Sequence, residues 1–272
     1  MKRKVRWPSY LIAILIVVFF LWPVLYVIFS SFKTLNEISS PNPTFFPDQW
    51  TLQSYIDVFQ KANFLRYIGN SFFVAVSSTA LAVVINTMAG YALSKFRFKG
   101  DKIILIIILS TIMLPLEVIM VPIYRVLTFF GMTDTYAALI IPAAATPTGI
   151  FLMRQYLVTI PDDLIESARI DGASEWKIFT RIIVPNAKAA IATLAIFSFM
   201  WRWNDYIWPL IAITDMNKYT MQLAIANLNG EFSMDYNGIL ASATISMVPM
   251  LFVFLIFQRQ FVQGTAQTGM KG

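Results

Sequence analysis

Six long apolar runs constrain this 272-residue chain more than any other feature, because each is long enough to cross a lipid bilayer. A membrane-spanning helix needs about 20 mostly apolar residues. Only 13% of the residues are charged, roughly half the usual share in a soluble domain. The sequence therefore predicts an all-α integral membrane protein with six transmembrane helices. The expected spans are Tyr10–Ser31, Asn70–Leu93, Ile103–Val121, Tyr136–Leu157, Ala189–Ala212 and Ile239–Phe257.

The first run follows four basic residues, as the apolar core of a signal peptide does. Such a core is usually about 7–15 residues long and precedes a small-x-small cleavage site. The run Tyr10–Ser31 is longer, and no such site follows it. We therefore expect a permanent span instead of a cleaved leader.

The basic residues predict how the chain is oriented. Fifteen of the 21 lysines and arginines fall on one side of the expected spans and five on the other, with Arg202 inside the fifth span. Because basic residues are enriched on the cytoplasmic side, we expect a multi-pass protein of the bacterial inner membrane with both termini cytoplasmic. The expected parts are a cytoplasmic N-terminus (1–9), a spanning domain (10–257) with a cytoplasmic loop (158–188), and a cytoplasmic tail (258–272). The net charge of +6 fits these basic edges better than nucleic-acid binding.

Several chemistries are excluded by what the chain lacks. It contains neither cysteine nor histidine, which removes disulfides, thiolate nucleophiles, imidazole bases and the usual zinc ligands. No acidic cluster has the spacing of a carboxylate metal site. No Gly-x-x-x-x-Gly-Lys-Ser/Thr loop occurs, so nucleotide phosphates are not bound in the P-loop manner. We expect a chain that is not an enzyme by itself and binds no cofactor or metal.

The loop at 158–188 is too polar to span a membrane and has the pattern of two short helices. Pro161 and the two aspartates after it are typical of a helix start, and Gly172 is typical of a helix end. Ser174 suits the N-cap of a second helix, which Pro185 limits at its far end. A segment this amphipathic is expected to lie on the membrane surface or to bind a partner protein.

The spacing within this loop resembles the EAA loop of ABC importer permeases. Glu166-Ser167-Ala168 matches its Glu-Ala-Ala start, Gly172 follows at the family's distance, and Ile182–Pro185 matches its Ile-x-Leu-Pro end. Ser167 and Val184 are mild departures from that pattern. The resemblance implies a coupling helix that fits a cleft of a cytoplasmic ATPase subunit. The residues it assigns to ATPase coupling are Glu166, Ser167, Ala168, Asp171, Gly172, Ala173, Trp176 and Phe179.

Two of these residues also have a purely structural interpretation. Glu166 lies three residues after Asp163, as in a capping box. Gly172 is equally suited to ending a helix without any partner. The spaced pattern as a whole favours docking.

Other motifs resemble the carbohydrate-uptake branch of these permeases, the MalG-like, binding-protein-dependent group: Asn70-Ser71, Ala89–Leu93, Trp203-Asn204-Asp205 and the tail after Phe261. The resemblance implies a type I-like importer fold. It also implies a second homologous permease, an ABC ATPase dimer that binds ATP and Mg, an extracytoplasmic solute-binding protein and a carbohydrate substrate, besides membrane lipid and without nucleic acid. The tail residues expected to make contact are Gln263 and Gly264.

Polar and aromatic residues within the spans are candidates for a substrate pathway, because a buried charge costs at least about 2.5 kcal/mol and usually faces a cavity or a partner. Indole faces stack on sugar rings, and amides and carboxylates bind hydroxyls. The candidates are Glu117, Trp203, Asn204 and Asp205. Plainer interpretations stay open: Asp205 neutralises Arg202 three residues away, Trp203 anchors a helix at the membrane interface, and Glu117 contacts the second permease.

The outer segment 214–237 is expected to reach the binding protein, because the corresponding loop of MalG-like subunits does so. The candidates there are Asn227, Asn229 and Glu231. An ordinary solvated loop is the alternative for these residues.

Two other classes of protein remain as alternatives. A secondary transporter would use charged groups deep in the bundle, often within inverted repeats, and a structural assembly protein would need no transport site. Neither class explains the EAA-like loop.

Overall fold

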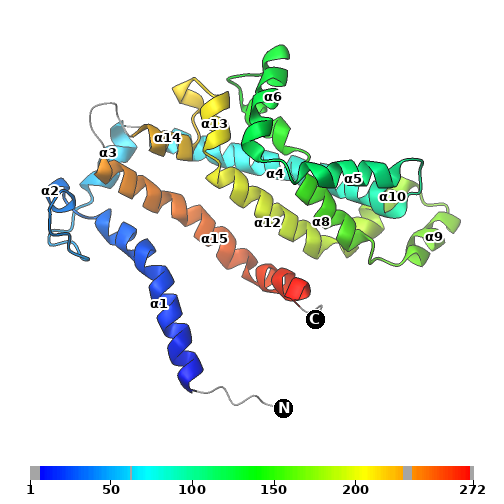
Figure 1. Ribbon diagram of the computed structural model, residues 1–272, viewed down its shortest axis with the longest axis horizontal. Helices are drawn as coiled ribbons and strands as arrows, with labels where there is room; N and C mark the ends of the chain where they lie inside the picture. Colours follow the sequence, from blue (N-terminus) through cyan, green and yellow to red (C-terminus); the bar gives the residue numbers. More distant parts are fainter. Residues whose placement is uncertain (1–6, 62, 229–234, 270–272) are drawn as a thin grey trace. The chain divides into compact units, whose positions relative to one another are not determined.

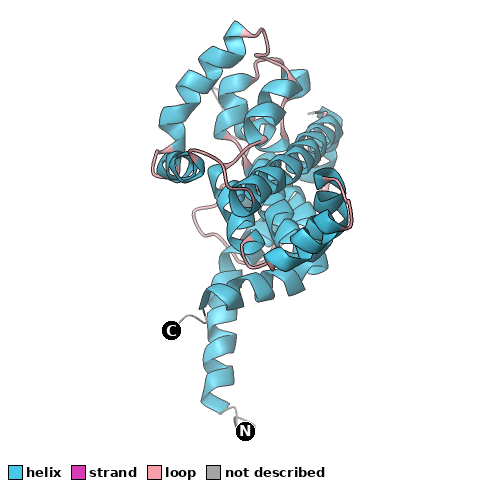
Figure 2. Ribbon diagram, turned by 90° about the vertical axis from the view of Figure 1, so that its right-hand side faces the viewer, coloured by secondary structure: helices cyan, strands magenta, loops and turns pink. Residues whose placement is uncertain are grey.

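The computed structural model describes residues 7–61, 63–228 and 235–269, and every regular element in them is a helix (Figures 1 and 2). The prediction of an all-α protein is confirmed. The elements are α1 Trp7–Ser30, α2 Leu35–Ile38, α3 Gln53–Lys61, α4 Phe64–Lys95, α5 Asp101–Thr111, α6 Leu116–Phe129, α7 Tyr136–Ile140, η1 Ile141–Ala143, α8 Pro147–Leu157, α9 Asp162–Ile170, α10 Glu175–Ile178, η2 Phe179–Ile183, α11 Val184–Asn186, α12 Lys188–Asn204, α13 Ile207–Ala212, η3 Met216–Lys218, α14 Met221–Asn227 and α15 Tyr236–Gly269.

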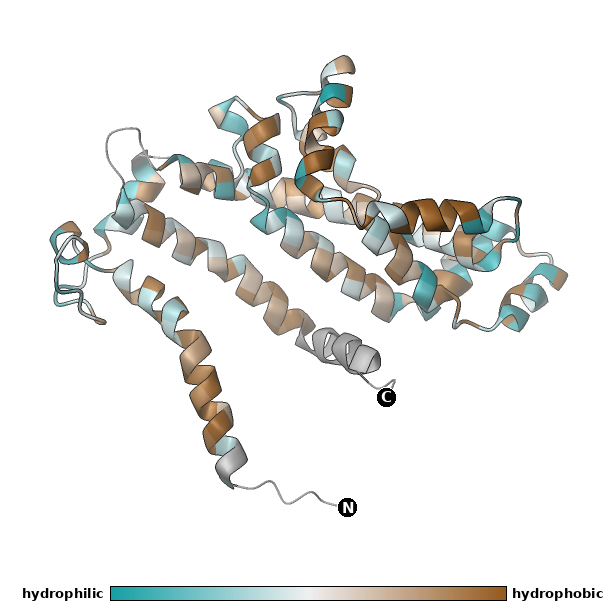
Figure 3. Ribbon diagram, viewed as in Figure 1, coloured by the Kyte–Doolittle hydropathy of each residue, from teal (hydrophilic) through white to brown (hydrophobic). Residues whose placement is uncertain are grey.

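The helices supply between four and six membrane spans. Two bent pairs each count as one span in the higher number, α5 with α6 and Glu175–Asn186 with α12. Figure 3 shows the contrast in hydropathy, with α5 almost continuously hydrophobic and α9 largely hydrophilic. The four spans without a sharp bend are Tyr10–Ser30, Phe64–Lys95, Tyr136–Leu157 and Tyr236–Phe257.

The chain divides into two compact units. Unit 1 comprises residues 1–66 and 224–251, and unit 2 comprises residues 67–223 and 252–272. In unit 1 none of the apolar stretch of α1 is buried. Asn237 ties two other parts of this unit together, because its Nδ2 donates to the Lys33 carbonyl at 3.0 Å and to Ser54 Oγ at 3.2 Å.

The interruption expected at Pro115 is confirmed and is larger than a kink. α5 and α6 are inclined at 109°. Pro115 has ψ 134° and lacks the N–H that would continue the hydrogen bonds of α5. The third span is therefore a sharply bent pair instead of one straight helix.

The fourth span tolerates its prolines because a polar side chain of α4 bonds the backbone at the interruption, as expected for a helix bundle. Thr146 caps α8, with Pro147 at the first helical position and Thr146 Oγ1 accepting from Gly149 N at 3.2 Å. Asn86 of α4 accepts from Thr146 N at 2.9 Å and donates Nδ2 to its Oγ1 at 3.4 Å. The break in the helix is thus satisfied by a neighbouring side chain.

The expected end of the fifth span is wrong. The fifth run does not continue to Ala212, because Asp205 leaves the helix with ψ 123° and α13 follows as a separate element. In a continuous helix the ring of Pro209 would clash with the carbonyl of residue 205. The sixth span ends at Phe257, as expected, although the helix α15 itself continues to Gly269.

Candidate functional site

The first half of the EAA-like loop forms α9, whose start lies where the sequence predicts it. Pro161 precedes the helix, and Asp162 and Asp163 occupy the first turn, where negative charge suits the exposed amides. The N-cap makes no side-chain hydrogen bond, so the capping box considered for Asp163 and Glu166 does not form. Ile165 is buried and fixes this helix on the rest of unit 2.

Gly172 ends α9 in a Schellman motif. Its N–H donates to the Arg169 carbonyl at 3.0 Å, and the N–H of Ala173 donates to the Ala168 carbonyl at 2.9 Å. Its φ of +75° lies in the left-handed region that favours glycine. A Cβ at this position would meet no atom within 4 Å, so the constraint comes from the backbone alone.

The second half starts at Ser174, whose side chain caps α10 by accepting from Lys177 N at 3.4 Å, as predicted. The following turn, η2, is a π-helix in which Val184 N donates to the Phe179 carbonyl. Pro185 explains this geometry, because it has no N–H for the ordinary bond to the residue four positions earlier. Phe179 is itself buried, so it supports the loop from within.

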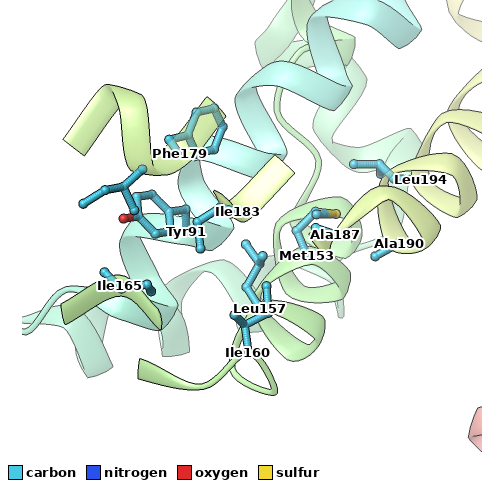
Figure 4. Packing of buried hydrophobic residues seen from close by; sticks show 11 residues of the cluster. Tyr91, Met153, Leu157, Ile160, Ile165, Phe179, Ile183, Ala187, Ala190 and Leu194 are labelled. Carbon is cyan, nitrogen blue, oxygen red and sulfur yellow. The ribbon is translucent and has the colours of Figure 1, made fainter. Parts of the chain in front are cut away.

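An apolar cluster packs the loop against the ends of α4, α8 and α12 (Figure 4). Ile165 of α9 and Ile178 of α10 join side chains from all three of those helices. The burial gives the loop a defined position on unit 2. The buried members are Tyr91, Met153, Leu157, Ile160, Ile165, Ile178, Phe179, Ile183, Ala187, Ala190 and Leu194.

Lys95 fastens the start of α9 to the end of α4. Its side chain is 3% exposed, and its Nζ donates to the Ile160 carbonyl at 2.5 Å and to Asp162 Oδ1 at 2.6 Å. The ammonium group holds the pKa of Asp162 below its usual value. Asp162 therefore stays ionised and paired throughout the physiological range.

Tyr91 fastens the middle of the loop, at the start of α10. Its OH donates to Glu175 Oε2 at 3.0 Å, while Arg169 Nε donates to Glu175 Oε1 at 2.6 Å. The Arg169 guanidinium also lies 5.7 Å from the ring centroid of Phe96. The hydrogen bond to Glu175 raises the pKa of Arg169, so its charge is retained.

The outward surface of the loop combines apolar and acidic groups. Three apolar side chains of the loop are exposed: Ile170 at 86%, Trp176 at 63% and Leu164 at 47%. Of the predicted coupling residues, Ala168 and Ala173 are half-buried. The exposed ones are Glu166, Ser167, Asp171, Gly172 and Trp176.

The four candidates for a substrate pathway differ in burial and in contacts, although three of them are consecutive. Trp203 is 1% exposed and its ring stacks on Phe199, with centroids 5.9 Å apart. Asn204 is exposed, and its Nδ2 donates to the Met200 carbonyl at 2.8 Å. Glu117 is exposed in the first turn of α6, beside the 109° bend.

Asp205 forms the ion pair that the sequence suggested, with Arg202 Nη1 3.4 Å from its Oδ2. Arg202 also lines a cavity of about 270 Å³ in unit 2, between α4, α8 and α12. Its mostly apolar wall includes the exposed Trp201 and the hydroxyls of Ser78 and Ser198. Among the described residues, Arg202 is the one charged group in that wall.

The remaining candidates are only partly described. Asn227 ends α14 and is exposed. Asn229 and Glu231 lie outside the described residues. Gln263 and Gly264 belong to the backbone of α15. Within the described residues, no group of three or more carboxylates is close enough to hold a metal ion.

Sequence reasoning missed the polar residues that hold distant segments together. Tyr91 and Lys95 contact partners 84 and 67 residues away, and their spacing of four was the one available clue. Asn70 was noted as a motif without a role. Its Nδ2 donates to the carbonyls of Asn217 and Tyr219, both at 2.9 Å.

Comparison with known proteins agrees with this arrangement. The chain is 32% identical over 254 residues to the arabinooligosaccharides transport system permease protein AraQ of Halalkalibacterium halodurans, covering 92% of this chain and 91% of the relative. It is 32% identical to the diacetylchitobiose uptake system permease protein NgcG of Streptomyces coelicolor, over 97% and 89% of the two chains. It is 31% identical to the sn-glycerol-3-phosphate transport system permease protein UgpE of Brucella abortus, over 96% and 95%.

A crystal structure of a bacterial ABC transporter involved in the import of the acidic polysaccharide alginate has the same fold. One of its chains superposes with a TM-score of 0.80 at 25% identity, covering 95% of this chain and 98% of that one. The profile of binding-protein-dependent transport system inner membrane components matches residues 82–267, which include the whole EAA-like loop. The chain thus belongs to the family of inner membrane components of binding-protein-dependent transport systems, as a multi-pass permease of an ABC importer.

Proposed function

We propose that this permease imports a neutral oligosaccharide and takes its energy from a separate ATPase dimer that docks on the loop 158–188. The observation that carries the proposal is the outward surface of α9 and α10. Ile170 and Trp176 are strongly exposed on a segment too polar to lie among lipid tails. Exposed apolar groups rimmed by carboxylates are typical of a partner's binding site.

The coupling residues divide by role in this proposal. Glu166, Asp171 and Trp176 meet the ATPase, which binds ATP and Mg. Ala168 and Ala173 let the two backbones come close, and the buried Phe179 holds the surface in position. Both termini, 1–9 and 258–272, lie on the same cytoplasmic side, with Gln263 and Gly264 in reach of the ATPase.

The sugar class is supported by the cavity in unit 2. Its indole and hydroxyls suit the apolar faces and hydroxyl groups of a sugar, and its one charge, Arg202, is compensated by Asp205. Asn204 and Glu117 are candidate contacts farther along the pathway. A second permease completes that pathway, and an extracytoplasmic binding protein delivers the sugar near Asn227 and the segment 229–231.

A second candidate substrate is a phosphorylated polyol, because the chain resembles UgpE as closely as it resembles the sugar permeases. A phosphate ester carries a charge that needs uncompensated cations or several N–H donors. The cavity provides no such cation among the described residues. We therefore favour the neutral sugar.

The first test is to purify the tagged permease from its native membrane with its partners and to reconstitute the complex in proteoliposomes. We expect a P-loop ATPase and a second permease to co-purify, and ATP-driven uptake of an oligosaccharide bound by the cognate binding protein. Uptake of glycerol phosphate and not of an oligosaccharide would show that the substrate is a phosphorylated polyol. Uptake by the chain alone on an ion gradient would overturn the proposal.

Docking is tested by Trp176→Ala, with Phe98→Ala as the matched control. Both rings are exposed outside the spans, but Phe98 lies in the other cytoplasmic loop. Removing an aromatic side chain from the centre of an interface costs about 2 kcal/mol, roughly a thirtyfold loss of affinity. We expect Trp176→Ala to lose the ATPase on washing and Phe98→Ala to retain it. Equal retention would remove α10 from the interface.

A further inference from the structure

Two side chains from the last turns of α4 hold the docking loop, residues 158–188, at its start and at its middle. Tyr91 and Lys95 are four residues apart and therefore share one face of the helix. Lys95 binds the start of α9 through Ile160 and Asp162. Tyr91 binds Glu175 at the start of α10. The loop is thus attached to α4 by polar contacts at two points, in addition to the apolar cluster.

Glu175 joins three elements with one carboxylate. Its two oxygens accept from different donors, Tyr91 of α4 and Arg169 of α9. Both Glu175 and Arg169 are partly exposed, at 46% and 40%. Exposed ion pairs add little to stability, whereas the buried cluster supplies most of the packing. The network therefore contributes orientation more than folding energy.

α4 is suited to carry a movement away from this network. It is an unbroken helix of 32 residues without proline, about 48 Å long at 1.5 Å per residue. At its other end Asn70 holds the carbonyls of residues 217 and 219, and Ser71 Oγ accepts from Met221 N at 2.7 Å. Displacement of the loop would reach both ends of this helix.

We infer that Tyr91 and Glu175 are positioning residues that make the docking loop and α4 move as one body, so that the ATPase stroke is transmitted along α4. The inference rests on the proposed docking function. Without the network the loop still packs and still binds the ATPase. The loop then moves relative to α4, so that less of its movement reaches α4.

The test uses Tyr91→Phe and Glu175→Gln in the complete reconstituted complex. Tyr156→Phe is the matched control, because it also removes a phenol that donates to this region, at 3.2 Å to the Asn186 carbonyl. The measured quantity is sugar transported per ATP hydrolysed, alongside the amount of ATPase retained. Losing one hydrogen bond of ordinary strength predicts a fall of about threefold to tenfold in Tyr91→Phe and Glu175→Gln. We expect full ATPase retention in all three variants and an unchanged ratio in Tyr156→Phe.

A second readout follows the loop directly. The chain has no cysteine, so Asp163→Cys on α9 and Met88→Cys on α4, both exposed and outside the predicted coupling residues, can be spin-labelled without background. We expect a narrow distance distribution that broadens with Tyr91→Phe or Glu175→Gln. An unchanged distribution together with an unchanged transport ratio would overturn the inference. Failure of the docking proposal gives a different result, because the ATPase would then be retained even by Trp176→Ala.

Discussion

At the scale of single residues, Gly149 shows how closely two spans are fitted together. A Cβ there would lie 2.5 Å from Thr146 Oγ1 and 2.9 Å from Asn86 Nδ2. Gly149→Ala is expected to lower the free energy of unfolding by about 1–3 kcal/mol, because the Asn86–Thr146 pair must shift. Thermal unfolding in detergent measures the effect. Gly69→Ala is the control, since its Cβ would meet nothing within 4 Å and alanine favours a helix by about 1 kcal/mol. Equal destabilisation by both would contradict the packing argument.

At Gly172 the constraint is the reverse of that at Gly149. A Cβ at Gly172 would meet no atom within 4 Å, but the backbone conformation itself disfavours a side chain. With φ +75°, a side chain there is strained by about 1–2 kcal/mol unless it tolerates the left-handed region. Gly172→Val should therefore weaken ATPase retention by loosening the Schellman turn, while Gly172→Asn should stay close to wild type. Quantitative co-purification of the ATPase compares the two. If Gly172→Asn is as damaging as Gly172→Val, the requirement is for close approach of the partner and not for φ.

At the scale of elements, the connections α6–α7 and α13–α14 of unit 2 are joined by Asp134. Its Oδ1 accepts from the backbone N–H of Thr214 and of Asp215, both at 3.0 Å, and its Oδ2 lies 3.2 Å from Lys218 Nζ. These donors lower the pKa of Asp134 below its usual value of 3.8, and the N–H of Asp215 has the largest effect. The stabilisation is therefore fully present above about pH 4 and is lost as the pH falls through the lowered pKa.

The measurement is the thermal unfolding temperature in detergent at pH 5 and at pH 3. Asp134→Asn keeps an oxygen acceptor but has no proton to gain in this range. We expect the wild type to lose more of its unfolding temperature between the two pH values than Asp134→Asn does. Parallel losses in the two proteins would show that this carboxylate does not contribute to the acid response.

Elements were predictable where the information is local, and less so where it is not. Pro161, Gly172 and Ser174 set the limits of α9 and α10 through their own backbone preferences, so the sequence predicted them. The separation of α13 from α12 was missed, although Pro209 forbids the hydrogen bond to residue 205, because apolar content alone joined the two. The attachment of Glu175 to Tyr91 was not predictable, since 84 residues separate them and only the tertiary fold brings them together.

At the scale of the whole molecule, the chain leaves large apolar surfaces uncovered. α1 buries none of its apolar stretch, and Phe129 of α6 is 85% exposed. The apolar composition predicted that such surfaces would face a bilayer. It could not distinguish faces that contact lipid from faces that contact another subunit. In the proposed importer, some of these apolar faces would meet a second permease instead of lipid.

The number of times the chain crosses the bilayer depends on whether the bent pair α5–α6 crosses it or turns back within it. Between Asp48 and Ser167, both exposed, lie α4, the bent pair and the span Tyr136–Leu157. If the pair crosses the bilayer, three crossings put the two residues on opposite faces; if it turns back, two crossings put them on one face. The basic residues predict three, with Ser167 cytoplasmic.

Cysteine labelling decides this, because the chain has no cysteine of its own. In intact cells whose outer membrane is permeabilised, a membrane-impermeant maleimide is expected to label Asp48→Cys and not Ser167→Cys. Inside-out vesicles should give the reverse pattern, and Ser242→Cys, at a fully buried position, should stay unlabelled in both. Labelling of Asp48→Cys and Ser167→Cys from the same side would make α5–α6 a re-entrant hairpin. With the other bent pair, Glu175–Asn186 with α12, counted as one span, the chain would then have five spans, an odd number. The termini would then lie on opposite faces, and the positive-inside assignment of one of them would be wrong.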